Sequence, residues 1–338
     1  MRKLLLTLTM LSSTFIGQAT TRTLNNANPS AGQYLSWSAV HAASADGDTV
    51  LVQGSLINYG SIDISKRLIV IGPGHNPIDK QNIQKAFCDN VLFSTGSNNS
   101  VVIGLETSNM QAYSNDVDSV KITNCKINDA VYFALNNANY WVIDGCVFSN
   151  TGYCLRADGH SVGDLLVRNC IFNGTVYAFN GTYIGYNYFN NNLFLGTSSY
   201  TFQYCNYNYI NNNIFYRSGF QDYANQGMVY NKNLSYLCNG GNTFPNGFNY
   251  ESVDPLFETN IGTGAYFNYN TNYHLQATSP VLTGGTDGTE LGIYGGDGDY
   301  EQFGVGHNPY IKTFNITGPT SVNAGDPIQV YIKAKVRN

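Results

Sequence analysis

The chain has 338 residues, a formal net charge of −5 and only 12% charged residues. So few charges argue against helices held by surface ion pairs, and the 17 Lys and Arg residues form no basic stripe that would suit a phosphate backbone. With 26 Tyr, 18 Phe and 35 Gly residues, the composition favours short strands joined by tight turns, so we expect an all-β protein without a nucleic-acid partner.

The first 19 residues have the pattern of an export signal. Arg2 and Lys3 precede an apolar stretch, and Gly17 and Ala19 supply small residues for cleavage. We therefore predict a signal peptide at 1–19 and a secreted or cell-surface protein. The other interpretation is an N-terminal core segment. No later run reaches the roughly 18 apolar residues of a membrane helix, so no membrane span is expected.

Residues 20–310 are predicted to form one domain that begins with a short helix near 34–44. In YLSWSAVHAAS, the apolar residues Leu35, Ala39, Val40 and Ala43 recur at helical spacing. Such a helix would cover the open end of the repeating structure that follows it.

A short phrase repeats through the centre of the chain. It reads ITNC at 122–125, IDGC at 143–146, VRNC at 167–170, FNNN at 189–192 and INNN at 210–213, and an apolar residue follows each phrase at the second position. The fourth positions are Cys125, Cys146, Cys170, Asn192 and Asn213, at intervals of 21, 24, 22 and 21 residues. A period of about 22 residues with short strand-like elements predicts a parallel β-helix solenoid of about eight to ten coils.

The fourth positions are expected to form a structural ladder. Asn tolerates the left-handed backbone of a sharp bend, and amides at the same place in successive coils can exchange hydrogen bonds. Cys125, Cys146 and Cys170 are then small buried thiols in the same column. The alternative is a disulfide between neighbouring coils, which an exported protein would allow.

These phrases resemble the repeats of right-handed parallel β-helix proteins of the pectate-lyase-like superfold. The segments VDPLF at 253–257, YHLQATSPVLTGG at 273–285 and ELGIYGG at 290–296 are similar to the closing coils of secreted bacterial proteins with this fold. ASADGDTVLVQGS at 43–55 is similar to their first coil. The resemblance implies the fold for residues 43–296 and says little about activity, because lyases, hydrolases and adhesins share it.

Residues 311–338 are predicted to form a β-hairpin packed on the solenoid. Val330, Ile332 and Ala334 alternate with polar residues, as in a half-buried strand, and Phe314 and Ile316 belong to its partner. The alternatives are the remainder of a β-sandwich domain and an export or anchoring tail.

A candidate site follows from the phase of one strand, GYCLRADG at 152–159. Alternation places Leu155 and Ala157 inside and Cys154, Arg156 and Asp158 outside. Asn136 and Asn180 lie 22 residues on either side of position 158, so the three are predicted to form a polar line on one face. In enzymes of the fold that this chain resembles, that face commonly binds polysaccharide.

The catalytic hypothesis assigns three roles at this face. Arg156 is a base or a clamp for a sugar carboxylate, Asp158 is a weak candidate for a calcium ligand, and His160 is a base or an acid. Calcium is the one cofactor considered, and GTDG at 285–288 and GGDGD at 295–299 are further acidic turns. A glycoside hydrolase would instead need two carboxylates, such as Asp158 with Asp144 or Asp164. The simpler interpretation is a surface ion pair between Arg156 and Asp158 and a turn at His160.

The binding hypothesis uses tyrosines that crowd the middle coils. Tyr177, with Asn136 and Asn180, is predicted to contact substrate, because exposed aromatic rings beside amides suit the faces and hydroxyls of sugars. We therefore expect a monomeric protein that binds extracellular polysaccharide. The alternatives are a polysaccharide lyase acting by β-elimination on uronate polymers, a glycoside hydrolase, and a purely structural surface protein or adhesin.

Overall fold

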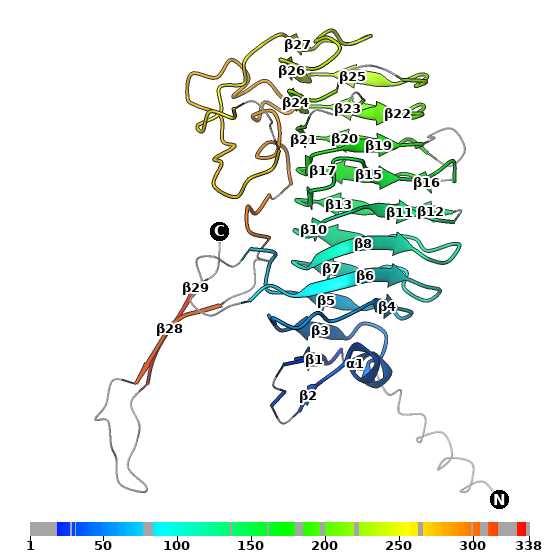
Figure 1. Cartoon of the computed structure of the whole chain (residues 1–338), viewed down its shortest axis with the longest axis vertical. Helices are drawn as coiled ribbons and strands as arrows, with labels where there is room; N and C mark the ends of the chain where they lie inside the picture. The colour runs from blue at the N-terminus through cyan, green and yellow to red at the C-terminus, as the bar shows by residue number, and fades with distance from the viewer. Residues whose placement is uncertain are drawn as a thin grey trace, which may run out of the picture.

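The protein is a parallel β-solenoid of about eight coils with a spacing of about 21 residues (Figure 1). The computed structural model describes residues 19–27, 29–30, 32–76, 84–135, 137–160, 162–179, 185–196, 200–219, 223–262, 266–298, 300–304, 310–316 and 330–335. Each complete coil presents three faces, which we call A, B and C.

Face A is an 11-stranded parallel sheet. In spatial order its strands are β2 (Gln33–Tyr34), β1 (Thr21–Leu24), β3 (Thr49–Val52), β5 (Ile69–Ile71), β7 (Val101–Ile103), β9 (Lys121–Thr123), β13 (Val142–Asp144), β17 (Leu166–Arg168), β20 (Tyr188–Asn190), β23 (Tyr209–Asn211) and β25 (Val229–Asn231).

Faces B and C are the two arms of a 14-stranded sheet, and the long strands β6 (Phe87–Phe93) and β8 (Glu106–Ala112) run through both arms. Face B continues with β10 (Lys126–Ile127), β14 (Val147–Phe148), β18 (Ile171–Phe172), β21 (Leu193–Phe194), β24 (Ile214–Tyr216), β26 (Leu234–Tyr236) and β27 (Tyr250–Glu251). Face C contains β4 (Ile62–Ile64), β11 (Val131–Phe133), β15 (Tyr153–Arg156), β19 (Thr175–Tyr177) and β22 (Phe202–Gln203). Strands β12 (Ala138–Asn139) and β16 (Val162–Gly163) pair between faces C and A.

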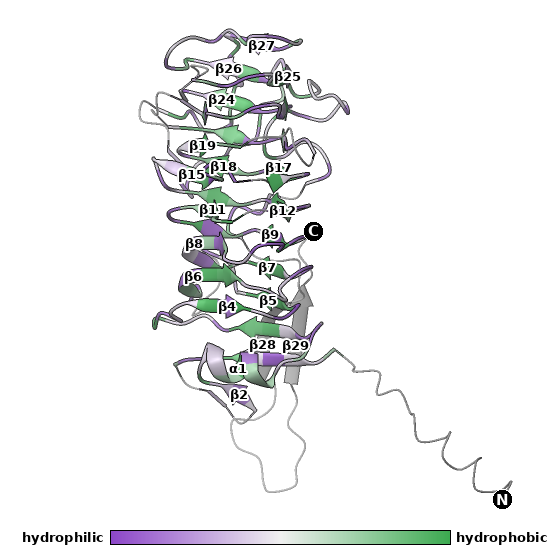
Figure 2. Ribbon diagram, turned by 90° about the vertical axis from the view of Figure 1, so that its right-hand side faces the viewer, coloured by the Kyte–Doolittle hydropathy of each residue, from purple (hydrophilic) through white to green (hydrophobic). Residues whose placement is uncertain are grey.

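The core lies inside the solenoid, and Figure 2 shows hydrophobic segments recurring at each level of the stack. The middle residue of each three-residue strand from β5 to β25 points inward on face A, for example Ile143 and Val167. On face B, four phenylalanine rings stack from coil to coil with centroid separations of 4.4, 5.1 and 4.9 Å; they belong to Phe148, Phe172, Phe194 and Phe215. Stacked rings of equal shape favour one register between coils.

The three asparagines of each INNN-type phrase have three different tasks. In the first phrase, Asn190 faces outward and its Oδ1 accepts from Asn211 Nδ2 at 3.1 Å. Asn191 makes the bend with φ of 55°, the left-handed conformation that asparagine tolerates. Asn192 is buried and forms the ladder: its backbone N–H donates to Asn213 Oδ1 at 2.8 Å, and its Nδ2 donates to Val167 O at 3.0 Å.

The cysteines occupy the same column as the ladder asparagines. The backbone N–H of Cys170 donates to Asn192 Oδ1 at 3.0 Å, and that of Cys146 donates to Cys170 Sγ at 3.3 Å. The Sγ of Cys146 points to Ile122 O at 3.7 Å, in the position that Asn192 Nδ2 takes two coils further on. All seven cysteines are free thiols, and burial raises the pKa of Cys125 and Cys146, so these thiols stay protonated. Hydrogen bonds connect the residues of this column, and no disulfide links its cysteines.

Residues 253–304, which we call the covering segment, do not form the closing coils that the resemblance suggested. The described part of this segment has turns in place of regular strands, and it lies along the outside of face B (Figure 1). The outward side chains of face B are apolar and need cover; they include Val147, Ile171, Leu193, Ile214 and Leu234. Tyr273, Val281 and Leu291 of the covering segment pack against them and form a second hydrophobic cluster.

A short helix, α1 (Trp37–Ala43), lies at the N-terminal end of the solenoid (Figure 1). Ser36 caps it by accepting from the N–H of Ala39 at 3.3 Å. Its buried residues are Trp37 and Val40, whereas Leu35 precedes the helix and is 58% exposed, so the predicted apolar face was partly wrong. Trp37 covers more area than Leu35 would, and its Nε1 donates to Asp63 O at 2.8 Å. Within the described residues, no helix is long and apolar enough to cross a membrane.

At the C-terminal end, β28 (Tyr310–Ile316) and β29 (Val330–Lys335) form the expected antiparallel hairpin. Its packing onto the solenoid stays a prediction, as do the domain limits at 19 and 310. Of the predicted signal peptide, residues 1–18 lie outside the described residues.

His75 anchors the far end of the covering segment. Its backbone N–H donates to Phe303 O at 3.0 Å, and its Nδ1 lies 2.8 Å from Tyr269 Oη. A Cβ on Gly304 would come within 2.2 Å of the imidazole ring, so glycine allows the close packing. Burial, followed by the nearby charges of Lys126 and Lys85, lowers the pKa of His75 to about 3. The ring is therefore held neutral.

We predict that Asn213→Ala lowers the free energy of unfolding by about 2–4 kcal/mol, because it removes the acceptor of Asn192 and leaves Phe189 O without its 2.7 Å donor. The matched control is Asn211→Ala in the same phrase, whose outward amide makes one partly buried bond, and it should cost about 0.5 kcal/mol or less. Denaturant unfolding measures both. Equal losses of unfolding free energy from the two variants would contradict the structural role of the buried ladder asparagines.

We also predict a His75-dependent loss of stability in acid. The unfolded chain takes up a proton near pH 6.5, whereas folded His75 does so only near 3, so its contribution is fully present above pH 6.5 and falls below it. The slope is about 1.4 kcal/mol per pH unit. The difference in unfolding free energy between wild type and His75→Asn should therefore shift by roughly 3 kcal/mol against wild type between pH 6.5 and 4. If the difference in unfolding free energy between the two proteins is the same at pH 6.5 and pH 4, the pKa of His75 is not lowered by folding.

Candidate functional site

The outward residues of face C form a continuous column. Strand register aligns Tyr132 of β11 with Arg156 of β15, Arg156 with Tyr177 of β19, and Tyr177 with Gln203 of β22. Their neighbours inside the solenoid are apolar, so alternation leaves this column on the surface.

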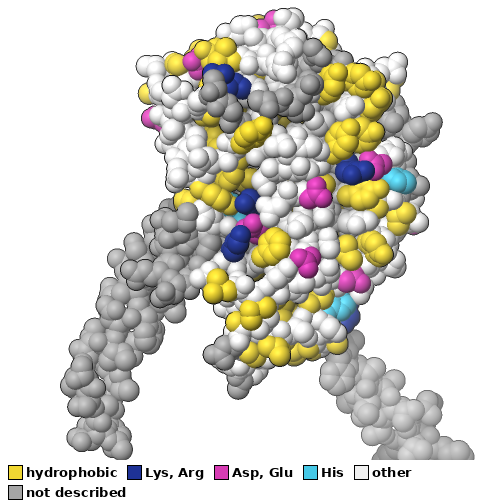
Figure 3. All heavy atoms as spheres, in the orientation of Figure 1, with side chains coloured by type: hydrophobic (Ala, Val, Ile, Leu, Met, Phe, Trp, Pro, Cys, Tyr) yellow, Lys and Arg dark blue, Asp and Glu magenta, His cyan; other side chains and the backbone are white. Residues whose placement is uncertain are grey.

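Tyrosine rings extend the column into a strip. Tyr153 lies 4.3 Å from Tyr177, Tyr177 lies 5.7 Å from Tyr204, and Tyr204 lies 5.4 Å from Tyr223, all between ring centroids. We call this group the tyrosine strip; its members are Tyr132, Tyr153, Tyr177, Tyr200, Tyr204 and Tyr223, with Arg156. Tyr153, Tyr204 and Tyr223 remain 39%, 41% and 41% exposed. Figure 3 shows side chains of the hydrophobic colour class, which includes tyrosine, along the right-hand side of the upper solenoid.

One ion pair sits within the strip. The Nε and Nη2 of Arg156 donate to the two oxygens of Asp158 at 3.2 and 2.5 Å. The Arg156 guanidinium lies 4.8 Å from the centre of the Tyr132 ring. The hydrogen bonds that Arg156 donates to Asp158 raise the pKa of Arg156, and burial raises the pKa of Tyr132, so the arginine stays charged and the phenol stays neutral. Arg156 can therefore hold an acceptor oxygen and is poorly suited to remove a proton.

The predicted outward orientation is confirmed for Arg156 and wrong for Cys154. A β-bulge between Tyr153 and Leu155 interrupts the pairing with β19. It turns Cys154 inward, where the side chain is fully buried and its Sγ contacts Asn150 O at 3.0 Å. The bulge lets Tyr153 and Arg156 both face outward.

The remaining predicted site residues are not all brought together. Asn136 and Asn180 lie outside the described residues. The pairing intervals around Arg156 are 24 and 21 residues, so its neighbours in register are Tyr132 and Tyr177. His160 lies in a turn after Asp158, and its N–H donates to Ala157 O at 2.8 Å.

One of the two carboxylate pairs considered for hydrolysis, Asp158 with Asp144, is divided between two faces. Asp144 lies on face A, where its Oδ2 accepts from Arg168 at 3.0 and 2.8 Å, whereas Asp158 lies at the end of a face C strand. Across the described part of the chain, no three His, Cys, Asp or Glu side chains gather as a metal site. Both oxygens of Asp158 accept hydrogen bonds from Arg156, and calcium binding at Asp158 stays a prediction.

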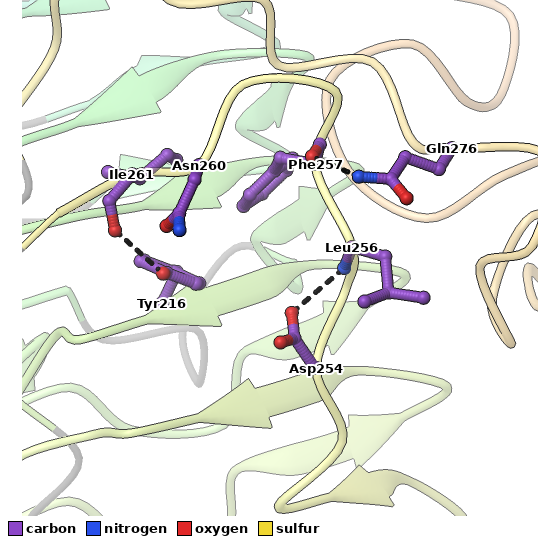
Figure 4. A pocket seen from close by; sticks show the side chains of 7 residues that line it. All are labelled: Tyr216, Asp254, Leu256, Phe257, Asn260, Ile261 and Gln276. Atoms are coloured by element: carbon purple, nitrogen blue, oxygen red, sulfur yellow. Dashed lines mark hydrogen bonds between the residues drawn. The ribbon is translucent and has the colours of Figure 1, made fainter.

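A cavity of about 160 Å³ lies between β24 and the covering segment (Figure 4). Three of its polar side chains bond to the chain: Tyr216 Oη donates to Ile261 O, Asp254 Oδ1 accepts from Leu256 N, and Gln276 Nε2 donates to Phe257 O, all at 2.9 Å. These bonds hold the covering segment in place, and we assign the cavity a structural role.

Sequence reasoning missed Tyr132 and Tyr153 as members of the strip. Tyr132 lies one coil from Arg156, but the 24-residue interval there hid the alignment that a uniform 22-residue period would have shown. The outward orientation of Tyr153 depends on the bulge, and the sequence gives no clear signal for that bulge. Tyr216, another tyrosine of the middle coils, is buried under the covering segment and does not join the strip.

Comparison with known proteins supports the fold. The structure is similar to the crystal structure of pectate lyase Pel9A, with a TM-score of 0.50, 12% sequence identity, and coverage of 82% of this chain and 96% of that chain. No protein-family model matches the sequence, and no curated protein matches it. At this identity the likeness shows architecture and carries no activity. The chain has the fold of a right-handed parallel β-helix, as pectate lyase Pel9A does.

Proposed function

We propose that the protein binds polysaccharide along the tyrosine strip of face C. The observation that supports this function is the exposed chain of rings from Tyr153 through Tyr177 and Tyr204 to Tyr223. Aromatic area left in water is unfavourable for the free protein, and contiguous patches of this kind are typical of interaction sites.

The chemistry of the strip suits sugars. A pyranose ring has faces made of C–H groups, which pack on phenol rings, and its hydroxyls bond to tyrosine Oη and to amides. Gln203 supplies an amide in the same column, and the guanidinium of Arg156 supplies N–H donors. Because coils repeat about every 4.8 Å, the strip offers contacts in a line, which favours an extended chain over a compact ligand.

The proposal includes a location and an assembly state. The signal pattern of residues 1–19 supports a secreted or cell-surface protein that meets extracellular glycans. We propose that it acts as a monomer. Binding is preferred over cleavage because Arg156 keeps its proton and the carboxylates of Asp144 and Asp158 lie on different faces. A structural surface role is the remaining alternative.

We predict that Tyr153→Ala/Tyr177→Ala weakens polysaccharide binding at least tenfold, because it removes two neighbouring rings, each of which would pack on a sugar, and one aromatic contact contributes about 0.5–1.5 kcal/mol beyond the area it buries. Affinity electrophoresis in gels containing pectin, polygalacturonate, alginate, xylan or glucomannan measures the effect. The matched control is Tyr188→Ala/Tyr209→Ala, which removes a different pair of neighbouring rings, 5.3 Å apart, from face A. Equal losses from the two variants would contradict a site on face C.

The same polymers distinguish binding from cleavage. A binding protein leaves them intact, so no ultraviolet absorbance from unsaturated ends and no new reducing ends should develop with wild-type protein. If the wild-type protein cleaves a polymer and Arg156→Ala abolishes that cleavage, the binding proposal is wrong and the protein acts as a lyase or hydrolase. Absence of both binding and turnover across the panel would favour the structural role.

A further inference from the structure

The tyrosine strip contains one cation, and a carboxylate beside it neutralises that cation. Among the described residues of the face C strands, Arg156 is the only Lys or Arg. Its Nε and Nη2 donate to the two oxygens of Asp158 at 3.2 and 2.5 Å, and the two side chains are 37% and 23% exposed. The ion pair therefore lies at the surface of the strip, where a bound polymer would meet it.

A second carboxylate faces the same guanidinium. Asp129, between β10 and β11, is exposed and accepts from Asn150 Nδ2 at 2.8 Å. The hydrogen bonds to Asp158 raise the pKa of Arg156 most, and the negative charge of Asp129 also raises it. Carboxylates therefore outnumber the cation at this part of the strip, in a protein whose net charge is −5.

This balance of charge opposes uronate polymers, which bring one carboxylate with every sugar ring. The strip extends over successive coils from Tyr132 to Tyr223, about 4.8 Å apart, so a polymer along it would place several carboxylates against face C. Arg156 can pair with at most one of them, and only in competition with Asp158. The others would lose water beside the rings without gaining a partner, and they would repel Asp158 and Asp129.

The same arrangement suits a neutral chain. The N–H groups of Arg156 that Asp158 does not use can donate to one sugar hydroxyl, and the remaining lone pairs of Asp158 can accept from another. The tyrosine rings pack on the C–H faces of sugars and stay uncharged, because burial raises the pKa of Tyr132 and a hydrogen bond with Tyr223 raises the pKa of Tyr204. No group of the strip then has to lose a charged partner when the chain binds.

We propose that the strip selects neutral polysaccharide over uronate polymers, and that Asp158 determines this specificity by neutralising Arg156. The specificity rests on the proposed binding function and names the class of its ligand. Asp158 follows β15 with a φ of 49°, a left-handed conformation that asparagine also tolerates. Asp158→Asn therefore removes the charge without straining the backbone.

Polymers that share a backbone and differ in charge test the specificity. Polygalacturonate and alginate are compared with their carboxyl-reduced forms, in which each carboxylate becomes a CH₂OH group, and glucomannan with the product of oxidising its CH₂OH groups to carboxylates. Calorimetry at about pH 8, where histidine is neutral, should show the neutral member of a binding pair to be about tenfold tighter or more. Added NaCl should strengthen binding of the acidic member, because it screens repulsion, and leave the neutral member unchanged.

Two variants assign the specificity to one residue. Asp158→Asn should tighten binding of the acidic polymer by about fivefold or more and leave the neutral polymer unchanged. The matched control is Asp46→Asn, which removes the same charge from an exposed turn between α1 and β3 and should change neither affinity. Thermal unfolding checks that both variants fold.

The proposed specificity is overturned if the acidic member of a pair binds as tightly as the neutral one, if NaCl weakens binding of the acidic member, or if Asp158→Asn and Asp46→Asn have equal effects. Preference for the acidic polymer overturns only the specificity, because the strip then still binds polysaccharide. If no polymer of the panel binds, the proposed function is wrong and the specificity falls with it.

Discussion

The solenoid depends on hydrogen bonds that buried side chains make to the backbone at each bend after face A. A left-handed residue such as Asn191 turns the chain there and interrupts the strand ladder. Asn192 and Asn213 restore the pairing with their amides, and Cys146 and Cys170 do the same with their thiols. Since a slip of one residue would leave these buried groups unpaired, the bends fix the register of every coil.

Because the register between coils is fixed, residues far apart in the sequence form continuous surfaces. Residues one coil apart become neighbours, so face C carries a line of tyrosines although the chain has no tyrosine run in β11 or β15. Face B, whose outward residues are apolar, is covered by residues 253–304 and is closed to ligands. The proposed polysaccharide site therefore follows from how the coils stack and from which faces are covered.

The repeat made the fold predictable, because Asn and Cys recur where the chain must bend and apolar residues flank them. Local departures from the period were not predictable. The 24-residue interval before Arg156 and the bulge at Cys154 decide which residues share the outer face, and neither has a sequence marker. The glycine-rich C-terminal stretch resembled further coils, and its role as a cover depends on long-range apolar contacts that a local pattern does not reveal.

Site-directed crosslinking between coils tests the register most directly. Asn190 and Asn211 pair across adjacent strands, where Cα atoms stand about 4.8 Å apart, within the range of a disulfide. Asn190→Cys/Asn211→Cys should therefore form a bond on mild oxidation that mass spectrometry identifies. Asn190→Cys/Tyr209→Cys, offset by two residues and about 8 Å apart, should not. Crosslinking of the offset pair in preference to the aligned pair would contradict the account.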